Sequence, residues 1–229
     1  MRMTKKQSSG RVYGGLSKEE RTAQRRQKFI DAGLEIFGTD GYQSATVRRL
    51  CREAGLTDRY YYESFASTEE LLMAVYDQCM DQIKETLMEA LSEAAPGADA
   101  VALIHRSLEA YFKFMEDERV ARVVMLEVVG VSEAVDKLYN ERMLVLADMF
   151  LALTRRVYPD FSISDEEGQL LGTSILGAMR QAVIHWFIQG YELKRETMVN
   201  TSAKLFLGLL ELVEKESKQH QDRAKSTDE

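Results

Sequence analysis

The sequence is poor in proline, cysteine and histidine, and it lacks long hydrophobic runs. Its 229 residues include 2 Pro, 2 Cys and 3 His. Long stretches without proline that are rich in Leu, Ala, Glu, Met and Arg favour helices. Cys51 and Cys79 are too few for a disulfide framework, which favours a reducing, cytoplasmic setting. The sequence therefore predicts an all-α fold.

Patterns that would indicate membrane insertion or catalysis are also missing. The longest apolar windows, Val123–Val131 and Met143–Leu153, are each interrupted by a charge and fall short of the roughly 18 residues that span a bilayer. The N-terminus lacks the continuous apolar stretch of a secretory signal. There is no Gly-rich phosphate loop, no GxSxG motif and no cluster of His, Cys and carboxylates at metal-ligand spacing. We expect no enzyme activity, no catalytic or metal-binding residues, no cofactor and no membrane partner.

Charge is unevenly distributed along the chain. The net charge of -7 on its own argues against a nucleic-acid partner. However, residues 1–65 carry 13 Lys and Arg against 8 Asp and Glu, a net charge of +5, while residues 66–229 have a net charge of -12. Such asymmetry points to a polyanionic partner for the basic segment. Residues 1–16 are basic and rich in Gly and Ser, so we expect a flexible arm there.

About nine helices are expected from capping signals and from apolar residues at helical spacing. Capping boxes begin at Ser17, Ser67 and Ser164, each with a glutamate three residues later. Glycines, Pro96 and Pro159 supply the breaks between helices. The expected helices cover approximately residues 17–38, 46–54, 57–65, 67–91, 99–116, 120–129, 132–157, 164–189 and 194–216.

Two short helices joined by a turn at Gly55 have the outline of a helix-turn-helix. Such a motif places its second helix in the DNA major groove, where Arg59 could pair with guanine through two hydrogen bonds. The helix start at Thr46 is a natural phosphate site. The alternative interpretation is that the basic residues form an ordinary solvated face and that Tyr61 belongs to the core. The candidate DNA-contacting residues are Thr46, Arg48, Arg49, Thr57, Asp58, Arg59, Tyr60, Tyr62 and Ser64.

The stretch from about Arg25 to Tyr76 resembles the DNA-binding domain of TetR-family transcriptional regulators, and it covers about a quarter of the chain. The matching pieces, in order and without a gap, are Ala32–Phe37, Gly41-Tyr42, Ala45–Val47, Ala54–Thr57, Tyr61-Tyr62 with Phe65, and Glu69–Leu72. The remainder agrees with the family only in length and helical plan. The resemblance implies phosphate contacts for Thr46 and Tyr62 and recognition-helix contacts for Thr57, Arg59 and Tyr60.

Three positions depart from the family pattern. Arg59 stands where a small residue is usual, and Ser64 stands where His or Tyr is usual. Thr68, which we add to the DNA-contacting candidates, stands where a lysine usually opens the fourth helix. Without that lysine a phosphate contact is lost, and Arg59 could compensate for the loss. The operator sequence therefore cannot be copied from better-known members.

The resemblance implies a division of the chain and a function. The expected parts are a flexible basic arm at 1–16, a helix-turn-helix domain at 17–66, an effector-binding and dimerisation domain at 67–217, and a frayed polar tail at 218–229. The implied protein is a dimeric, ligand-responsive regulator, a repressor that a small, largely apolar effector releases from a palindromic DNA operator. The sequence leaves open repression or activation, and also a helical module whose basic arm binds an acidic surface without DNA preference.

The larger domain offers candidates for a ligand pocket and for a dimer interface. Eight of the 11 methionines lie at or beyond Met80, and methionine suits adaptable apolar pockets, although ordinary core packing is the favoured explanation for each single methionine. Glu127 is a single acid in an apolar segment, so it is either paired in the core or polar within the pocket. The candidate ligand residues are Tyr111, Phe112, Met115, Met125, Glu127, Met149, Leu153 and Met179. Broad apolar faces on the last two helices predict a four-helix interface between two chains, through Trp186, Phe187, Phe206 and Leu210.

Overall fold

The computed structural model describes residues 17–93, 99–157 and 163–227, and all the regular structure within them is helical. This confirms the all-α class and, over those ranges, the nine predicted α-helices. The expected arm at 1–16 lies outside the described residues. The elements are α1 (Lys18–Asp40), η1 (Tyr42–Ser44), α2 (Val47–Ala54), α3 (Asp58–Ser64), α4 (Thr68–Ser92), α5 (Ala100–Phe114), α6 (Glu118–Arg122), η2 (Val123–Glu127), α7 (Glu133–Val157), α8 (Asp165–Ile188) and α9 (Arg195–Thr227).

The helix starts follow the capping signals. Ser17 and Ser164 each accept a hydrogen bond from the N–H of the glutamate three residues later, and that glutamate accepts one from the serine N–H. At Ser67 only half of the predicted box forms, because the Glu70 carboxylate accepts from the N–H of Ala66 instead.

Three boundaries differ from those expected. α1 continues through Gly38 to Asp40 and ends at Gly41, which has a φ of 87°. α9 remains helical to Thr227, so the frayed tail predicted from residue 218 is wrong over that range. That stretch contains no Gly or Pro, and six of its ten residues are Lys, Gln, Arg or Ala, which favour helix. The helix predicted at 120–129 is two pieces, α6 and the π-helical turn η2.

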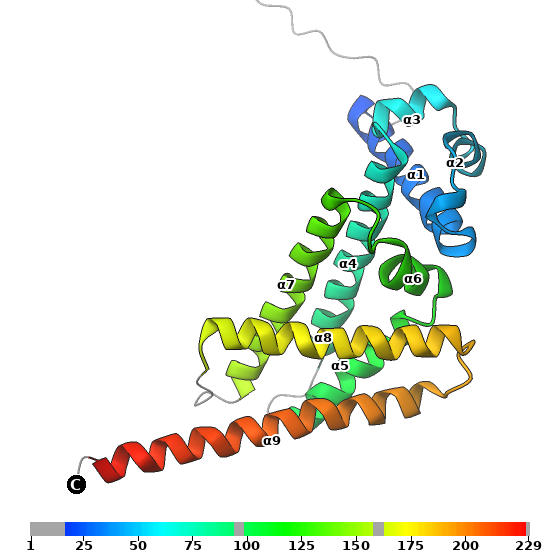
Figure 1. Cartoon of the computed structure of the whole chain (residues 1–229). Coiled ribbons are helices and arrows are strands. Elements are labelled where there is room, and N and C mark those ends of the chain that lie inside the picture. Colours follow the sequence, from blue (N-terminus) through cyan, green and yellow to red (C-terminus); the bar gives the residue numbers. More distant parts are fainter. Residues whose placement is uncertain (1–16, 94–98, 158–162, 228–229) are drawn as a thin grey trace, which may run out of the picture.

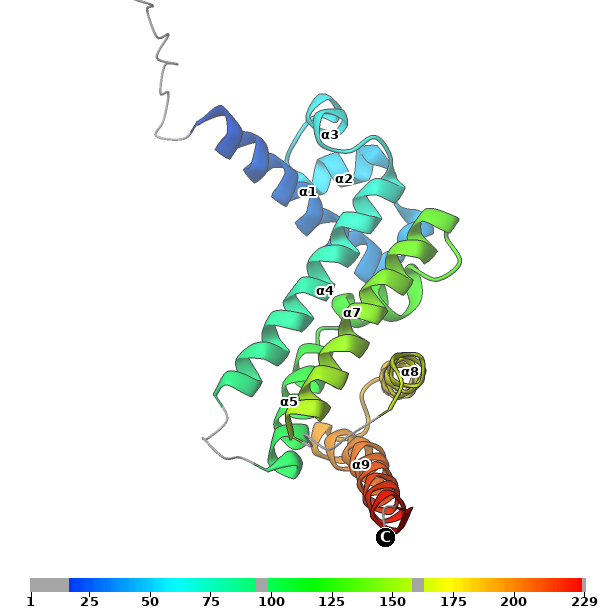
Figure 2. The ribbon, with the colours of Figure 1, turned by 90° about the vertical axis from the view of Figure 1, so that its left-hand side faces the viewer.

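We call residues 17–66 the head and the described residues from 67 onward the body. In Figure 1, α1, α2 and α3 gather at one end, and α4 runs from them down into the body beside α7. α6 lies between the head and α8. The helices α8 and α9 lie on the same side of the body, where Figure 2 shows both almost end-on. α8 packs on α7, and α9 packs on α5.

Aromatic rings fill the core of the head. Phe29 meets Tyr61 edge-on with ring centroids 5.2 Å apart and also meets Phe65 edge-on. The Tyr61 hydroxyl donates to the Ser67 carbonyl at 3.1 Å. Tyr61 and Phe65 are thus core residues, as predicted. Cys51 and Cys79 are buried and free. Within the described ranges, we find no helix that combines the length and hydropathy needed to cross a bilayer.

Candidate functional site

The helix-turn-helix is built from α2, a tight turn and α3. Thr46 begins α2 by accepting a hydrogen bond from the N–H of Arg49 at 3.3 Å. Gly55 ends it in the left-handed conformation, with a φ of 64°, which glycine adopts without the strain of a Cβ atom. Leu50 of α2 and Tyr61 of α3 are fully buried and hold the two helices against α1. This arrangement fixes which side chains the motif presents to solvent.

Six of the candidate DNA-contacting residues point outward. The Arg59 side chain is 82% exposed, and its Nε donates to Glu63 one helical turn away at 3.0 Å. Tyr62 is 61% exposed although it is aromatic. The exposed candidates are Thr46, Arg48, Thr57, Asp58, Arg59 and Tyr62. They form a polar surface that spans the start of α2 and the length of α3.

The other four candidates are engaged within the protein. Arg49 forms an ion pair with Asp40. The Ser64 hydroxyl donates to the carbonyl of Tyr60 at 3.0 Å, so it is satisfied on its own helix. The half-buried ring of Tyr60 lies beneath the Arg25 guanidinium, 4.5 Å from it. Thr68 is half-buried at the first turn of α4. Contacts from these four residues to DNA stay predictions.

A small apolar cavity of about 40 Å³ lies inside the body among α4, α5, α7, α8 and η2. Four of the predicted ligand residues line it, namely Tyr111, Met115, Met125 and Met179. Sequence reasoning missed the other lining residues, which are Tyr76, Met80, Ile83, Val124, Tyr139, Met143, Leu146, Leu176 and Arg180. One sequence signal did point to Arg180, because it is the sole Lys or Arg between Arg156 and Lys194.

The remaining ligand candidates lie elsewhere. Phe112 packs edge-on against the ring of Trp186, with centroids 5.7 Å apart, and belongs to the core. Met149 and Leu153 are half-buried on α7, and neither lines the cavity. The fourth, Glu127, contacts the head.

The cavity wall contains polar atoms that lack partners. The Tyr76 hydroxyl and the Arg180 Nε are buried without a hydrogen-bond partner. Burial raises the pKa of both the Tyr76 and Tyr111 hydroxyls, and the positive charge of Arg180 opposes that rise at each. The other end of Arg180 is bound, because its Nη2 donates to the Met125 carbonyl of η2 at 2.6 Å.

A polar junction joins the body to the head. The Glu127 carboxylate accepts from the Arg122 Nε at 2.8 Å and from the N–H of Tyr42 in η1 at 2.8 Å. Arg122 also donates to the carbonyl of Thr39, at the end of α1, at 2.7 Å. Of the two roles open to Glu127, the structure therefore selects the paired one. Two residues of η2, Val124 and Met125, line the cavity, so this one turn contacts both sites.

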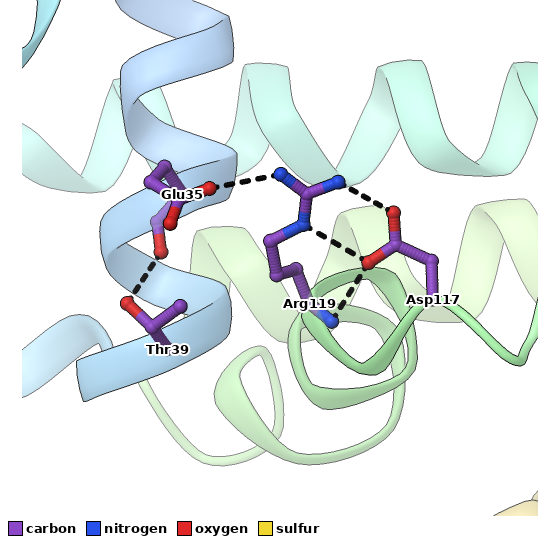
Figure 3. Close-up of polar contacts among 4 residues, drawn as sticks. All are labelled: Glu35, Thr39, Asp117 and Arg119. Atoms are coloured by element: carbon purple, nitrogen blue, oxygen red, sulfur yellow. Dashed lines mark hydrogen bonds and ion pairs between the residues drawn. The ribbon is translucent and has the colours of Figure 1, made fainter.

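Arg119 of α6 forms the second half of the junction (Figure 3). Its guanidinium bonds the Glu35 carboxylate of α1 at 2.8 Å and the Asp117 carboxylate, and the side-chain hydrogen bond to Arg119 lowers the pKa of Asp117. The helices approach closely because Gly38 has no side chain; a Cβ atom there would lie 2.8 Å from the Arg119 carbonyl oxygen. The junction therefore combines ion pairs with a tight backbone contact.

The predicted dimer residues are covered by their own chain. Trp186 is 2% exposed, and its Nε1 donates to the carbonyl of Leu193 at 2.8 Å. Phe206 packs edge-on against Phe150, Leu210 is buried, and Phe187 is half-buried. The large apolar side chains that α8 and α9 expose are different ones, Leu170, Ile188, Leu205 and Leu212, each at least 53% exposed. A dimer interface through Trp186, Phe187, Phe206 and Leu210 stays a prediction, and each of these side chains is at least half-buried within its own chain.

Comparison with known proteins agrees with this architecture. The N-terminal family model of bacterial regulatory proteins, tetR family, matches residues 29–75. The fatty acid metabolism regulator protein of Bacillus subtilis (strain 168) is 29% identical over 108 residues, which is 45% of this chain and 54% of that protein. The nicotine-responsive transcriptional repressor HdnoR of Paenarthrobacter nicotinovorans is 25% identical over 108 residues, 47% of this chain and 54% of the repressor. The chain thus spans about half the length of the curated relatives it matches.

Solved structures share the whole fold. The transcriptional regulator FadR from Bacillus subtilis, in complex with stearoyl-CoA, superposes with a TM-score of 0.68 at 20% identity, over 78% of this chain and 96% of that chain. A helix-turn-helix head on a larger helical body defines the class of DNA-binding transcription regulators. Within that class, the head matches the TetR family of bacterial regulatory proteins over residues 29–75. The matched relatives carry the names of regulators and not of enzymes.

Proposed function

We propose that the protein is a dimeric, ligand-responsive transcription regulator, a repressor that leaves its palindromic operator when a small, largely apolar effector enters the cavity of the body. The observation that carries this proposal is the double contact of η2. Val124 and Met125 of that turn line the cavity, while Glu127 of the same turn bonds the head. A ligand that displaces Val124 and Met125 therefore also shifts Glu127, which belongs to the same turn.

The head supplies the DNA-binding end of the mechanism. Arg59 is exposed on α3, where a guanidinium can pair with guanine in the major groove. Thr46 places a hydroxyl at the exposed start of α2, and Tyr62 places one on α3, where phosphates are in reach. Basic residues of α1 and α2 add the salt-dependent attraction to the DNA backbone.

The cavity and the junction support responsiveness to a ligand. In this state the cavity is far smaller than the roughly 300 Å³ at which ligand pockets begin, so an effector has to enlarge it. A ligand shifts the population only if it binds one conformation better, and an enlarged cavity is such a conformation. Relatives support this direction: HdnoR is named as a nicotine-responsive repressor, and the Bacillus subtilis FadR structure contains stearoyl-CoA.

Specific DNA binding is the decisive test. A gel shift would use the DNA upstream of the gene itself and of its neighbours, with random DNA as competitor, at two salt concentrations. We expect a specific complex that weakens steeply with salt, roughly 5- to 150-fold loss of preference at particular bases for Arg59→Ala, and a smaller, uniform loss of affinity for Tyr62→Phe. Arg106→Ala, which removes a surface arginine of the body, is the matched control. Absence of any specific complex would contradict the proposal.

The dimer forms through the outer faces of α8 and α9. Besides four exposed apolar side chains, these helices contain Gly177 and Gly208, where an added Cβ atom would meet nothing within 4 Å. Two such faces give a closed, twofold interface, and twofold symmetry matches a palindromic operator. α8 and α9 lie side by side on one flank of the body, which leaves the head unobstructed (Figure 2).

Sedimentation equilibrium tests this interface. We expect a mass of twice 26.1 kDa for the wild type and dissociation for Leu205→Glu, because the charge would be buried without a partner. Leu144→Glu, at an exposed leucine of α7, is the control and should remain dimeric. A monomeric wild type, or equal dissociation of both variants, would rule out the interface.

A further inference from the structure

The cavity contains a guanidinium whose charge is not neutralised. No Asp or Glu carboxylate of the described residues lies within 4 Å of Arg180, although most arginines of the body have one. Arg142, which acts on the same Tyr76 hydroxyl, is paired with Asp77 and Asp81. Arg180 is half-buried, and its Nε is buried without an acceptor among the described residues. A cation without a counter-ion in an apolar wall is costly, so its presence there needs an explanation beyond packing.

A second polar group stands beside it. Tyr76 has no exposed surface, lines the same cavity, and its hydroxyl has no partner among the described residues. A phenylalanine would fill the same space without leaving a donor unsatisfied. Both residues line the same cavity, and each has one buried donor, a guanidinium N–H or a phenol O–H, without an acceptor among the described residues. Both donors suit an oxyanion.

The rest of the wall is apolar and deformable. Five methionines line it, and methionine side chains change rotamer easily and accept varied shapes. The present volume of about 40 Å³ holds about three water-sized groups, which is the size of a head group and not of a whole ligand. An apolar body would have to displace the methionines, whereas the present volume admits a group of the size of a carboxylate.

We propose that the effector is an amphipathic anion, a carboxylate on an apolar body, whose carboxylate binds Arg180 and Tyr76 while its apolar part displaces the methionines. This inference rests on the proposed ligand-responsive function and names the class of its ligand. The carboxylate accepts hydrogen bonds from the Arg180 Nε and the Tyr76 hydroxyl, the two lining groups that lack an acceptor among the described residues. No bond is made or broken in the ligand.

The position of Arg180 also connects the anion to the junction. The same guanidinium holds the Met125 carbonyl of η2 through Nη2. A carboxylate bound to it competes for this donor or turns it, and either change acts on η2. Because Glu127 of η2 bonds the N–H of Tyr42, the charged end of the ligand acts directly on the contact with the head.

Calorimetric titration of the full chain without DNA tests the proposal with two matched pairs of probes: octanoate against 1-octanol, and 4-phenylbutyrate against 4-phenyl-1-butanol. We expect at least one acid to bind about tenfold or more tightly than its alcohol. Arg180→Gln should weaken binding of that acid at least about tenfold and leave the alcohol nearly unchanged. Arg180→Lys should retain part of the preference, since the charge remains. Tyr76→Phe should weaken binding of the acid by about 2- to 10-fold, since a single neutral hydrogen-bond donor is lost.

Arg142→Gln is the matched control, because it removes an arginine from the same neighbourhood whose charge is already paired. It should leave the preference for the acid in place. Equal binding of acid and alcohol, an equal loss of both in Arg180→Gln, or binding of no acid at all would overturn the proposal. If Arg180→Gln does not fold, Arg180→Lys and the isosteric Tyr76→Phe still decide it. These outcomes are independent of specific DNA binding, whose absence would overturn the proposed function instead.

Discussion

The head and the body differ in whether their buried polar side-chain atoms have hydrogen-bond partners. Within the described residues, all three buried side-chain polar atoms without a hydrogen-bond partner belong to the body, on Tyr76, Ser107 and Arg180. In the head, the comparable Tyr61 hydroxyl bonds the Ser67 carbonyl. Aromatic rings at fixed edge-on angles fill the head, and methionines fill the cavity region of the body. Under the proposed function this contrast has a reason: a head that fits one shape of DNA is specified tightly, while a body that admits a ligand retains unsatisfied groups.

The largest expected effect lies where the two regions meet. Gly38→Val would force a side chain into the backbone of Arg119, so we expect a loss of about 3 kcal/mol in the free energy of unfolding, together with separation of α1 from α6. Urea denaturation measures it. Ala23→Val, the same type of substitution at an exposed position of α1, should cost less than about 1 kcal/mol. Similar losses in both variants would show that the close approach at Gly38 is not tight.

Two tyrosines test the comparison itself. Tyr61 and Tyr76 are equally buried, but only the first has a partner for its hydroxyl. Tyr61→Phe should destabilise the protein by about 1 kcal/mol, because the Ser67 carbonyl loses a hydrogen bond. Tyr76→Phe should leave stability unchanged or raise it by up to about 1 kcal/mol, because an unsatisfied group disappears. Thermal unfolding of both variants at one pH measures the difference, and equal destabilisation would break the contrast between head and body.

The smallest expected effect is a dependence on pH at the junction. The hydrogen bond from Arg119 holds the pKa of Asp117 below its ordinary value in the folded protein. Its contribution to stability is therefore complete above the pKa of the unfolded chain, near 4, and is lost as the pH falls through the lower folded value.

Asp117→Asn should flatten the decline of unfolding free energy below about pH 5 by a few tenths of a kcal/mol, since the pair is partly exposed. Unfolding titrations from pH 7 to pH 3 measure the slope. Asp99→Asn, which changes an N-cap aspartate without an ion pair among the described residues, is the control. If unfolding free energy declined as steeply in Asp117→Asn as in the wild type, the ion pair of Asp117 with Arg119 would not contribute to the stability of the junction.

Local chemistry made much of the fold predictable. The serines at 17 and 164 begin their helices as expected, because a capping box needs only neighbours along the chain. The inward positions of Tyr61 and Phe65 followed from helical spacing alone. The apolar character of Trp186 was equally visible, but spacing cannot tell whether such a face meets its own chain or a second one. Here the chain covers it with Phe112 and Tyr191.

The missed features depend on contacts between distant elements or on irregular backbone. Glu127 pairs with Arg122 five residues earlier, which is not the i,i+3 or i,i+4 spacing of neighbours on an α-helix, and the segment between them is π-helical. Arg180 was visible as a lone charge in an apolar run, but its lack of a carboxylate partner depends on what α4 and α5 place opposite. The exposure of Leu205 depends in the same way on how α9 sits against α5.

The π-helical turn has a consequence for how the protein can move. Its backbone bonds reach five residues back instead of four, so the segment contains one residue more than an α-helix of the same length. Such a segment can relax to α-helix only by passing a whole residue along the chain, a step of about 1.5 Å that turns everything after it by about 100°. Glu127 ends that turn and would leave the N–H of Tyr42 entirely. The geometry therefore favours a contact between Glu127 and the N–H of Tyr42 that is either made or lost, with no intermediate register.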